Sequence, residues 1–166
     1  METYSFPTVA GVKFDELRAR LEEVSDQREH LVVPLSKMRV TSDGKLITRE
    51  DHPLLMTAPF LTALSREAGV PSRYVLKSPG DVAAENLNYW LPKTPGAKTV
   101  VAVGGLAVGL LPDNFSPIPM FRLVARLKDQ PLKVARFTYD AEGLEVGLIS
   151  DTQVAEPKKG DIILNV

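Results

Sequence analysis

The segment from 57 to 91 constrains the fold most, because it reads as two helices separated by a defined stop. Pro59 is compatible with the first turn of a helix, where its missing N–H has no intrahelical partner. Gly69 stands where a helix end needs a left-handed residue, and Pro71 blocks continuation of that helix. Residues 82–91 then resume a helical pattern. The sequence predicts a helix capped by its preceding threonine, a stop, a short helix and another helix.

The last helix of this segment has a predicted inner face. Ala83, Leu87, Trp90 and Leu91 recur at helical spacing, so the pattern predicts that Trp90 lies in the core and that Tyr89 projects away from it. We expect Asp81 to be the N-cap residue of this helix. If Trp90 is a core residue, its replacement by alanine costs about 3–5 kcal/mol. The core set expected for the whole segment is Phe60, Leu61, Leu64, Val75, Leu87 and Trp90.

Three pairs of β-type segments flank turn sequences and predict hairpins. The turns are Asp43-Gly44, Gly104-Gly105 and the segment 140–143. The arms flanking them are 37–41 with 45–48, 98–103 with 106–111, and 132–139 with 144–150. The second pair is almost wholly apolar, which is typical of strands covered on both faces. We therefore expect that hairpin at the centre of the sheet.

Three further segments complete the predicted elements. Residues 13–29 place apolar side chains on one helical face, and Pro117 or Pro119 can begin another amphipathic helix. Residues 160–166 read as an apolar strand that pairs within the sheet or with another subunit, or whose partner belongs to a longer protein from which this chain is cut. The apolar residues of the two helices are Phe14, Leu17, Leu21 and Val24 in the first, and Met120, Leu123, Val124 and Leu127 in the second.

These elements predict an α+β fold with a mainly antiparallel sheet built from hairpins and three or four helices packed on one side. A length of 166 residues and a hydrophobic content of 44% suit a single domain, 1–166, with a sizeable core. The absence of cysteine excludes disulfides, thiolate metal sites and cysteine nucleophiles. It also fits a reducing compartment.

The charge balance excludes a strong field around the whole molecule. Twenty basic and twenty-one acidic residues leave a net charge of −1, so any nucleic-acid binding requires a local patch. No apolar run approaches the roughly 20 residues that span a bilayer, and the first residues lack the order of a signal peptide. We expect a soluble, untargeted protein with no membrane partner.

Metal-binding and catalytic patterns are weak throughout the sequence. The two histidines, His30 and His52, lie twenty-two positions apart, and a surface role explains both more simply than metal binding does. No nucleophile elbow or phosphate loop occurs, so we predict no catalytic residues, no metal and no cofactor. The least unfavourable catalytic set would combine Glu85, Asn86, Asn88, Asp113 and Asn114.

One local excess of cations stands out in the C-terminal third. Its candidate nucleic-acid-binding residues are Arg122, Arg126, Lys128, Lys133, Arg136 and Tyr139. Arg122 and Arg126 share a helical face, and Phe137 and Tyr139 alternate with Arg136 along the following strand. Cations interleaved with aromatic residues suit single-stranded nucleic acid. An ordinary solvated surface explains the same residues and remains the competing interpretation.

Two segments carry a resemblance to a known group of proteins. The orders Leu-x-x-x-Ala-Gly-Val-Pro-x-x-Tyr, within 60–74, and Ala-Glu-Asn-Leu-Asn-x-Trp-Leu, within 84–91, are similar to the N-terminal half of a phage- and plasmid-borne family without an established function. The family's arginines around the following hairpin and turn are absent from 103–112. The chain therefore resembles a divergent or shortened member, or an N-terminal piece of one.

This resemblance implies a mobile-element origin, because the matching motifs are patterns of helix packing and carry no chemistry. Together with the cations near the C-terminus, it leads to the hypothesis of a phage or plasmid accessory protein that lies in the host cytoplasm or is associated with the virion. Such a protein would bind single-stranded nucleic acid or a phage-encoded replication or recombination partner. The alternative is a structural or assembly protein that forms a homo-oligomer or a virion component, as the apolar segment 162–166 would allow.

Overall fold

The computed structural model describes residues 1, 3–4, 9–11, 13–48, 52–115, 122, 124–126, 132–139 and 144–150. Its α-helices include α1 (Phe14–Asp26), α2 (Ala58–Glu67), α3 (Ser72–Lys77) and α4 (Gly80–Trp90), and its 3-10 turns include η1 (Leu35–Lys37) and η2 (Leu91–Lys93). The strands are β1 (Val9–Gly11), β2 (Arg28–Pro34), β3 (Arg39–Val40), β4 (Lys45–Ile47), β5 (Leu54–Met56), β6 (Ala97–Val103), β7 (Leu106–Pro112), β8 (Leu132–Tyr139) and β9 (Leu144–Ser150). Residues 122 and 124–126 are also helical.

The strands form two sheets. One has six strands in the order β2-β6-β7-β5-β4-β3, and the other has three in the order β1-β8-β9. Strands β5 and β7 pair in parallel, whereas the other paired strands are antiparallel. The predicted α+β class with mainly antiparallel pairing is confirmed. The division into two sheets was not predicted, because it depends on pairing between β1 and the distant β8.

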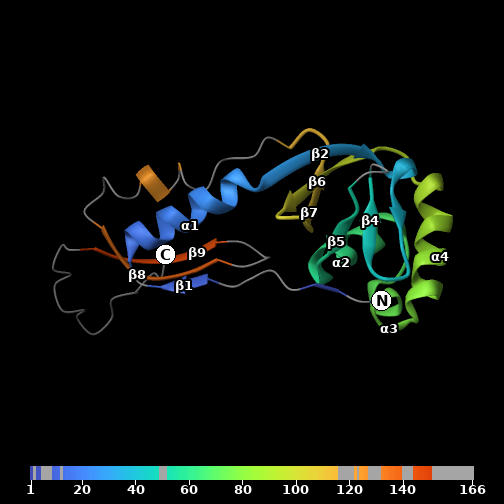
Figure 1. Cartoon of the computed structure of the whole chain (residues 1–166), viewed down its shortest axis with the longest axis horizontal. Coiled ribbons are helices and arrows are strands. Elements are labelled where there is room, and N and C mark those ends of the chain that lie inside the picture. Colours follow the sequence, from blue (N-terminus) through green and yellow to red (C-terminus); the bar gives the residue numbers. More distant parts are fainter. Residues whose placement is uncertain are drawn as a thin grey trace, which may run out of the picture.

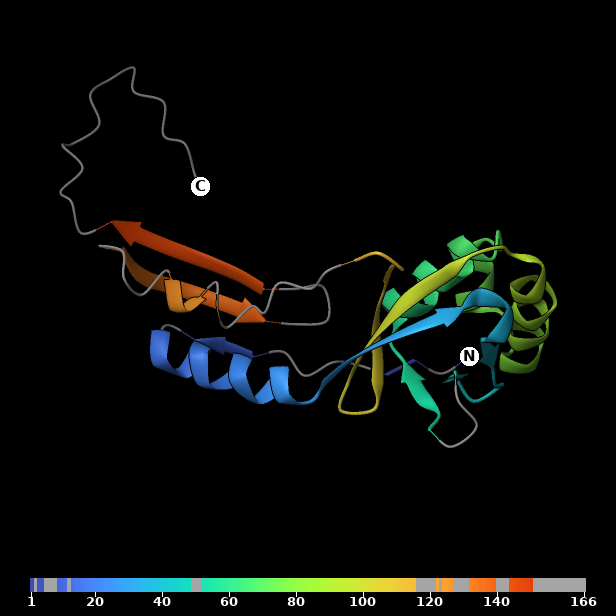
Figure 2. The same cartoon turned by 90° about the horizontal axis from the view of Figure 1, so that it is seen from above.

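The two sheets lie toward opposite ends of the drawn molecule (Figures 1 and 2). The larger lobe, as we name it, consists of the six-stranded sheet with α2, α3 and α4 around it. The smaller lobe consists of β1, α1, β8 and β9, and α1 runs alongside its sheet. Strand β2 follows α1 after one residue, Gln27, and carries the chain into the larger lobe. No helix within the described residues is long and apolar enough to cross a membrane.

The hairpin of β6 and β7 turns at Gly104-Gly105, as predicted. Val103 pairs with Leu106, and both glycines have positive φ angles, of 55° and 82°. Two consecutive positive φ angles are typical of a type I′ turn, whose twist matches that of the strands. Both strands lie inside the six-stranded sheet, with β6 between β2 and β7. The predicted central position is therefore confirmed.

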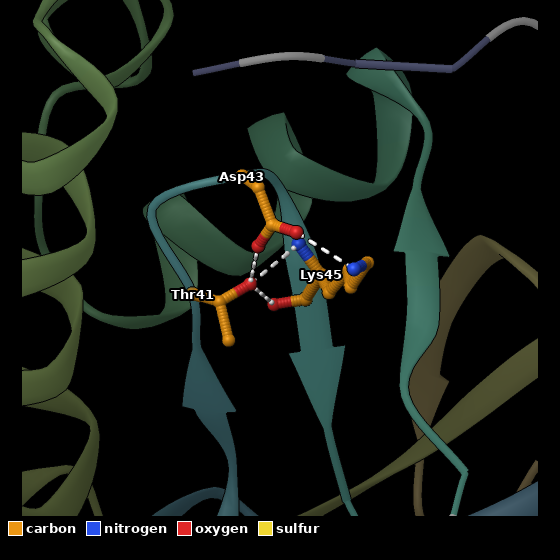
Figure 3. A network of polar contacts seen from close by, with 3 residues as sticks. All are labelled: Thr41, Asp43 and Lys45. Atoms are coloured by element: carbon orange, nitrogen blue, oxygen red, sulfur yellow. Dashed lines mark hydrogen bonds and ion pairs between the residues drawn. The ribbon is translucent and has the colours of Figure 1, made fainter.

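The hairpin of β3 and β4 is also present, but its loop has three residues where the sequence predicted two. Val40 pairs with Leu46, the Gly44 N–H donates to the Thr41 carbonyl, and Gly44 has a φ of 83°. A polar network closes the turn (Figure 3). The Thr41 hydroxyl contacts Asp43 at 2.5 Å, and Asp43 pairs with Lys45 at 2.7 Å. These groups belong to the turn itself, so we assign them a structural role.

The helical segment starts and stops as its sequence predicts. The Thr57 hydroxyl accepts from the Phe60 N–H at 3.4 Å and donates to the Ala107 carbonyl at 3.0 Å, which ties the start of α2 to β7. Gly69 follows α2 with a φ of 70°.

The expected N-cap role of Asp81 is wrong, since α4 begins at Gly80 and Asp81 makes no side-chain cap. Asp81 lies within the first turn, where the helix dipole favours a carboxylate.

The core of the larger lobe contains the expected apolar residues with one exception. Phe60, Leu61, Leu64, Val75 and Leu87 are fully buried, which confirms those assignments. Trp90 is 45% exposed, so its assignment to the core is wrong.

The reason lies in the geometry of the last helical turn. Ala83, Ala84, Leu87 and Leu91 form a continuous buried stripe, and at about 100° per residue Trp90 falls just outside it. Leu91 begins η2 and is fully buried in its place.

The smaller lobe has its own buried residues. They are Leu17 and Leu21 of α1, Phe137 of β8, and Val124. The bounds of β8 and β9 match the predicted arms. A side chain at Gly11 would meet the Phe137 ring at 2.7 Å, so β1 approaches that ring closely. The predicted strand 160–166, the residues Met120, Leu123 and Leu127, and the side chains of Phe14 and Val24 lie outside the described residues.

Candidate functional site

The cations predicted to bind nucleic acid are only partly described. Arg122, Arg126 and Arg136 are exposed. Lys128 and the side chains of Lys133 and Tyr139 lie outside the part of the chain that the structure describes. The Arg136 guanidinium pairs with the Glu145 carboxylate of β9 at 3.0 Å, on an exposed surface. Arg136 therefore already has an anionic partner, whereas Arg122 and Arg126 make no ion pair among the described residues.

The aromatic part of that prediction meets a structural obstacle at β8. Successive side chains of a strand point to opposite faces, so Phe137 and Arg136 face opposite sides of the smaller sheet. Phe137 is buried against Gly11 and is unable to stack on a ligand in this conformation. The role of Phe137 is packing. Because side chains alternate between the two faces of the sheet, the cations and the aromatic rings of this strand do not share one face.

The structure instead brings exposed aromatic rings together at the end of α4. Tyr89 is 58% exposed, and its ring meets the Trp90 ring edge to face, with centroids 5.1 Å apart. Edge-to-face geometry is one of the two favourable arrangements of an aromatic pair. Contiguous exposed apolar surface is a feature of binding sites, so we take this pair of rings as a candidate contact surface.

A lysine from η2 completes this cluster. The Lys93 ammonium lies 3.1 Å from the centroid of the Tyr89 ring and 5.2 Å from that of Trp90, within cation–π range of both. The ammonium lowers the pKa of the Tyr89 hydroxyl, first by hydrogen bonding and then through its charge. Rings and a cation thus meet in one exposed place, which we name the ring cluster: Tyr89, Trp90 and Lys93.

A third exposed ring lies next to the ring cluster. Tyr74 of α3 is 45% exposed, and its hydroxyl accepts from the Asn86 amide at 3.4 Å. The same amide donates to the Val82 carbonyl at 2.9 Å. Asn86 precedes Tyr89 by three positions and Trp90 by four, so all three share one side of α4. The sequence interpretation noted Asn86 and the freer position of Tyr89, but it missed Tyr74 because no local pattern links α3 to α4.

The two histidines are not brought together. An open pocket of about 460 Å³ at one end of the larger lobe is lined by His52, Thr48 and Glu29 above apolar residues that include Leu54 and Ala102. His30 does not line it, since it points to the other face of β2 from Glu29. Burial and then the charge of Arg28 lower the pKa of His30. Within the described residues, no group of three or more histidines and carboxylates could hold a metal ion.

The residues considered for catalysis do not form a site. Asn88 bonds to the backbone of Val40 in both directions, accepting from its N–H at 2.8 Å and donating to its carbonyl at 2.8 Å. This amide therefore serves the edge of β3 and is not free for chemistry. Glu85, Asp113 and Asn114 are exposed, and no hydrogen bond or ion pair joins any two of them within the described residues.

Comparisons with known proteins assign no roles to these residues. No family model matches the sequence, and no curated protein or solved structure matches it.

Proposed function

We propose that this protein acts by binding single-stranded nucleic acid, as an accessory protein of a phage or plasmid in a host cytoplasm. The main support for this proposal is the ring cluster of Tyr89, Trp90 and Lys93. Unpaired bases stack on exposed aromatic side chains irrespective of sequence, and nearby cations attract the phosphates. The resemblance in the sequence supports the mobile-element origin.

The ring cluster suits unpaired bases better than paired ones. A duplex hides the faces of its bases in the stack, so exposed aromatic side chains at a helix end reach only bases that are unstacked. The Lys93 ammonium lies beside both rings, where it can meet a phosphate next to a stacked base. Arg122 and Arg126 offer a second cationic contact, on the part of the chain that follows the larger lobe.

Binding of a labelled, unstructured oligonucleotide at low salt tests this function by fluorescence anisotropy. Loss of one stacked base weakens binding by roughly 5- to 150-fold, so Trp90→Ala should fall in that range. Ile149→Ala, which removes an exposed apolar side chain from the smaller lobe, is the control and should bind like the parent protein. Absence of binding at low salt contradicts the proposal.

The cations near the C-terminus have a separate test in the same assay. Arg122→Ala combined with Arg126→Ala should reduce the dependence of the affinity on salt by up to about two units of slope. An unchanged slope would place both arginines outside the contact surface and leave the ring cluster as the site.

A second candidate function is assembly into a homo-oligomer or a virion component through a sheet edge. Asn88 blocks the β3 edge of the larger sheet by bonding to Val40, but no described residue hydrogen-bonds across the outer edge of 29–33 in β2. Val32 of this edge strand is 62% exposed. Unpaired apolar edges invite strand addition. Light scattering should then show an oligomer that Val32→Lys dissociates, and a strict monomer at high concentration would contradict assembly.

A further inference from the structure

Three exposed rings of the larger lobe, those of Tyr74, Tyr89 and Trp90, lie in two places on one surface. Tyr74 belongs to α3, whereas Tyr89 and Trp90 end α4. Asn86 lies between them, because its amide donates to the Tyr74 hydroxyl and it precedes Trp90 by four positions on the same side of α4. The hydroxyl of Tyr74 therefore lies about one helical turn, or roughly 5.4 Å along the axis of α4, from the level of Trp90.

This separation exceeds the spacing of stacked bases. Neighbouring bases in a continuous stack are about 3.4 Å apart, so one stack does not place adjacent bases on both Tyr74 and Trp90. A strand with adjacent bases on both positions is therefore unstacked between those two bases. An unpaired strand of two or more nucleotides meets this requirement, whereas a free nucleotide reaches one position and the bases of a continuous duplex stay stacked.

The charges around the two positions suit a phosphate backbone. Arg73 and Lys77 flank Tyr74 on α3, at one position before it and three after it. Neither makes an ion pair within the described part of the chain. Lys93 flanks the other position. The charged residues of α3, α4, η1 and η2 are the cations Lys37, Arg73, Lys77 and Lys93 and the carboxylates Asp81 and Glu85.

The two carboxylates have different relations to the surface. Asp81 lies in the first turn of α4, far from Trp90 along the helix. Glu85 precedes Tyr89 by four positions, so it lies on the side of Tyr89 and repels a phosphate there. Removal of this one charge should strengthen binding, which distinguishes an anionic ligand from a neutral one.

We propose that the site has two separate stacking positions, Tyr74 and the Tyr89–Trp90 pair, and that its ligand is an unpaired nucleic-acid strand that spans both. This inference rests on the proposed function and adds Tyr74, Arg73 and Lys77 to the contact surface. The occupant is a strand with unpaired bases. Its bases stack on the rings, and its phosphates meet the nearby cations Arg73, Lys77 and Lys93, which have no carboxylate partner within the described residues.

Affinities for oligothymidylates of one to eight nucleotides test the two positions. The parent protein should bind more tightly as the length passes from one to about four nucleotides, and Tyr74→Ala should remove this gain. Trp90→Ala should weaken binding by roughly 5- to 150-fold at every length. Leu76→Ala is the matched control, since Leu76 lies on the same helix, is 40% exposed and carries no ring. Glu85→Gln should tighten binding at low salt.

The outcomes separate this inference from the function on which it rests. Weakening by Trp90→Ala, together with identical length dependence for Tyr74→Ala and the parent, overturns the two-position site and leaves single-strand binding intact. No binding of any oligothymidylate at low salt, or equal binding of a matched duplex, overturns both. Binding of a proline-rich peptide without binding of oligonucleotides also overturns both, because such a ligand uses exposed rings without needing phosphate contacts. Circular dichroism of each variant confirms that a loss of binding occurs in a folded protein.

Discussion

At the scale of single residues, Trp90 and Leu91 are adjacent but lie in different environments. Leu91 is fully buried, whereas Trp90 is exposed beside Tyr89 and Lys93. The helical pattern placed both on the inner face, because spacing alone does not say which residue at the border of a stripe is covered. The buried stripe of α4 is narrow at this end, and the 3-10 turn that follows directs Leu91 into the core.

A pair of substitutions on α4 tests this division in terms of stability. Leu87→Ala should lower the free energy of unfolding by about 2–5 kcal/mol, because it leaves a cavity in the core. Trp90→Ala should lower it by about 1 kcal/mol or less, as is usual for surface positions. Urea titration of both variants measures the two values. A loss for Trp90→Ala as large as that for Leu87→Ala would mean that Trp90 is a core residue after all.

The contact between Lys93 and Tyr89 predicts an unusual titration. The ammonium lowers the pKa of the Tyr89 hydroxyl by favouring the phenolate, so Tyr89 should lose its proton at a lower pH than an unperturbed tyrosine. Ultraviolet difference absorbance during an alkaline titration should show one early transition. Lys93→Met should shift that transition upward, toward the usual range of tyrosine, and Lys77→Met should leave it in place. An identical titration curve for Lys93→Met would contradict the contact.

At the scale of elements, the accuracy of the sequence predictions depended on how local each signal was. Gly104-Gly105 predicted its hairpin correctly, because two positive φ angles are a requirement that glycine meets within the turn itself. Asp43-Gly44 predicted the right hairpin with a loop one residue too short, since Ser42 joins the turn. Asp81 was predicted to be the N-cap residue, but α4 already begins at Gly80, so Asp81 lies inside the first turn. Helix ends are assigned less securely from sequence than helix interiors.

The edge of β3 depends on one amide from α4. Asn88 accepts from and donates to the backbone of Val40, in the way that a neighbouring strand would. Asn88→Ala leaves both Val40 groups without this partner and should cost about 1–3 kcal/mol of unfolding free energy. Thermal and urea unfolding measure the loss, with exposed Asn114→Ala as the control. Amide hydrogen exchange at Val40 should also accelerate in Asn88→Ala, and unchanged protection there would show that this bond is dispensable.

At the scale of the whole molecule, local patterns indicated the class but not the arrangement. The hairpins and helices implied an α+β fold, yet the pairing of β1 with β8 joins segments more than 120 residues apart, as in Val9 with Tyr139. Contacts of that kind leave no periodic trace in a single sequence. The contact between Tyr74 and Asn86 was not predicted either, although both residues belong to the helical segment, because it depends on how α3 packs beside α4.

The candidate residues suggested by the sequence and those gathered by the structure lie in different places. The sequence pointed to cations interleaved with aromatics along β8, but β8 turns Phe137 into the core. The structure instead gathers Tyr89, Trp90 and Lys93 at the end of α4, where helical spacing had predicted a buried Trp90. Tertiary packing determines which aromatic residues are buried and which are exposed. The exposed rings of a candidate site can therefore be identified only once the fold is known.

Fluorescence of the single tryptophan, Trp90, tests the ring cluster and its proposed role together, because this residue reports both on its own exposure and on the ligand. The exposed position of Trp90 predicts red-shifted emission, typical of a ring in water, in the folded protein. We also expect an unpaired oligonucleotide at low salt to quench this emission to saturation, while a duplex of the same sequence quenches it much less. Blue-shifted emission that responds to neither ligand would contradict both the exposed ring cluster and its role in binding single strands.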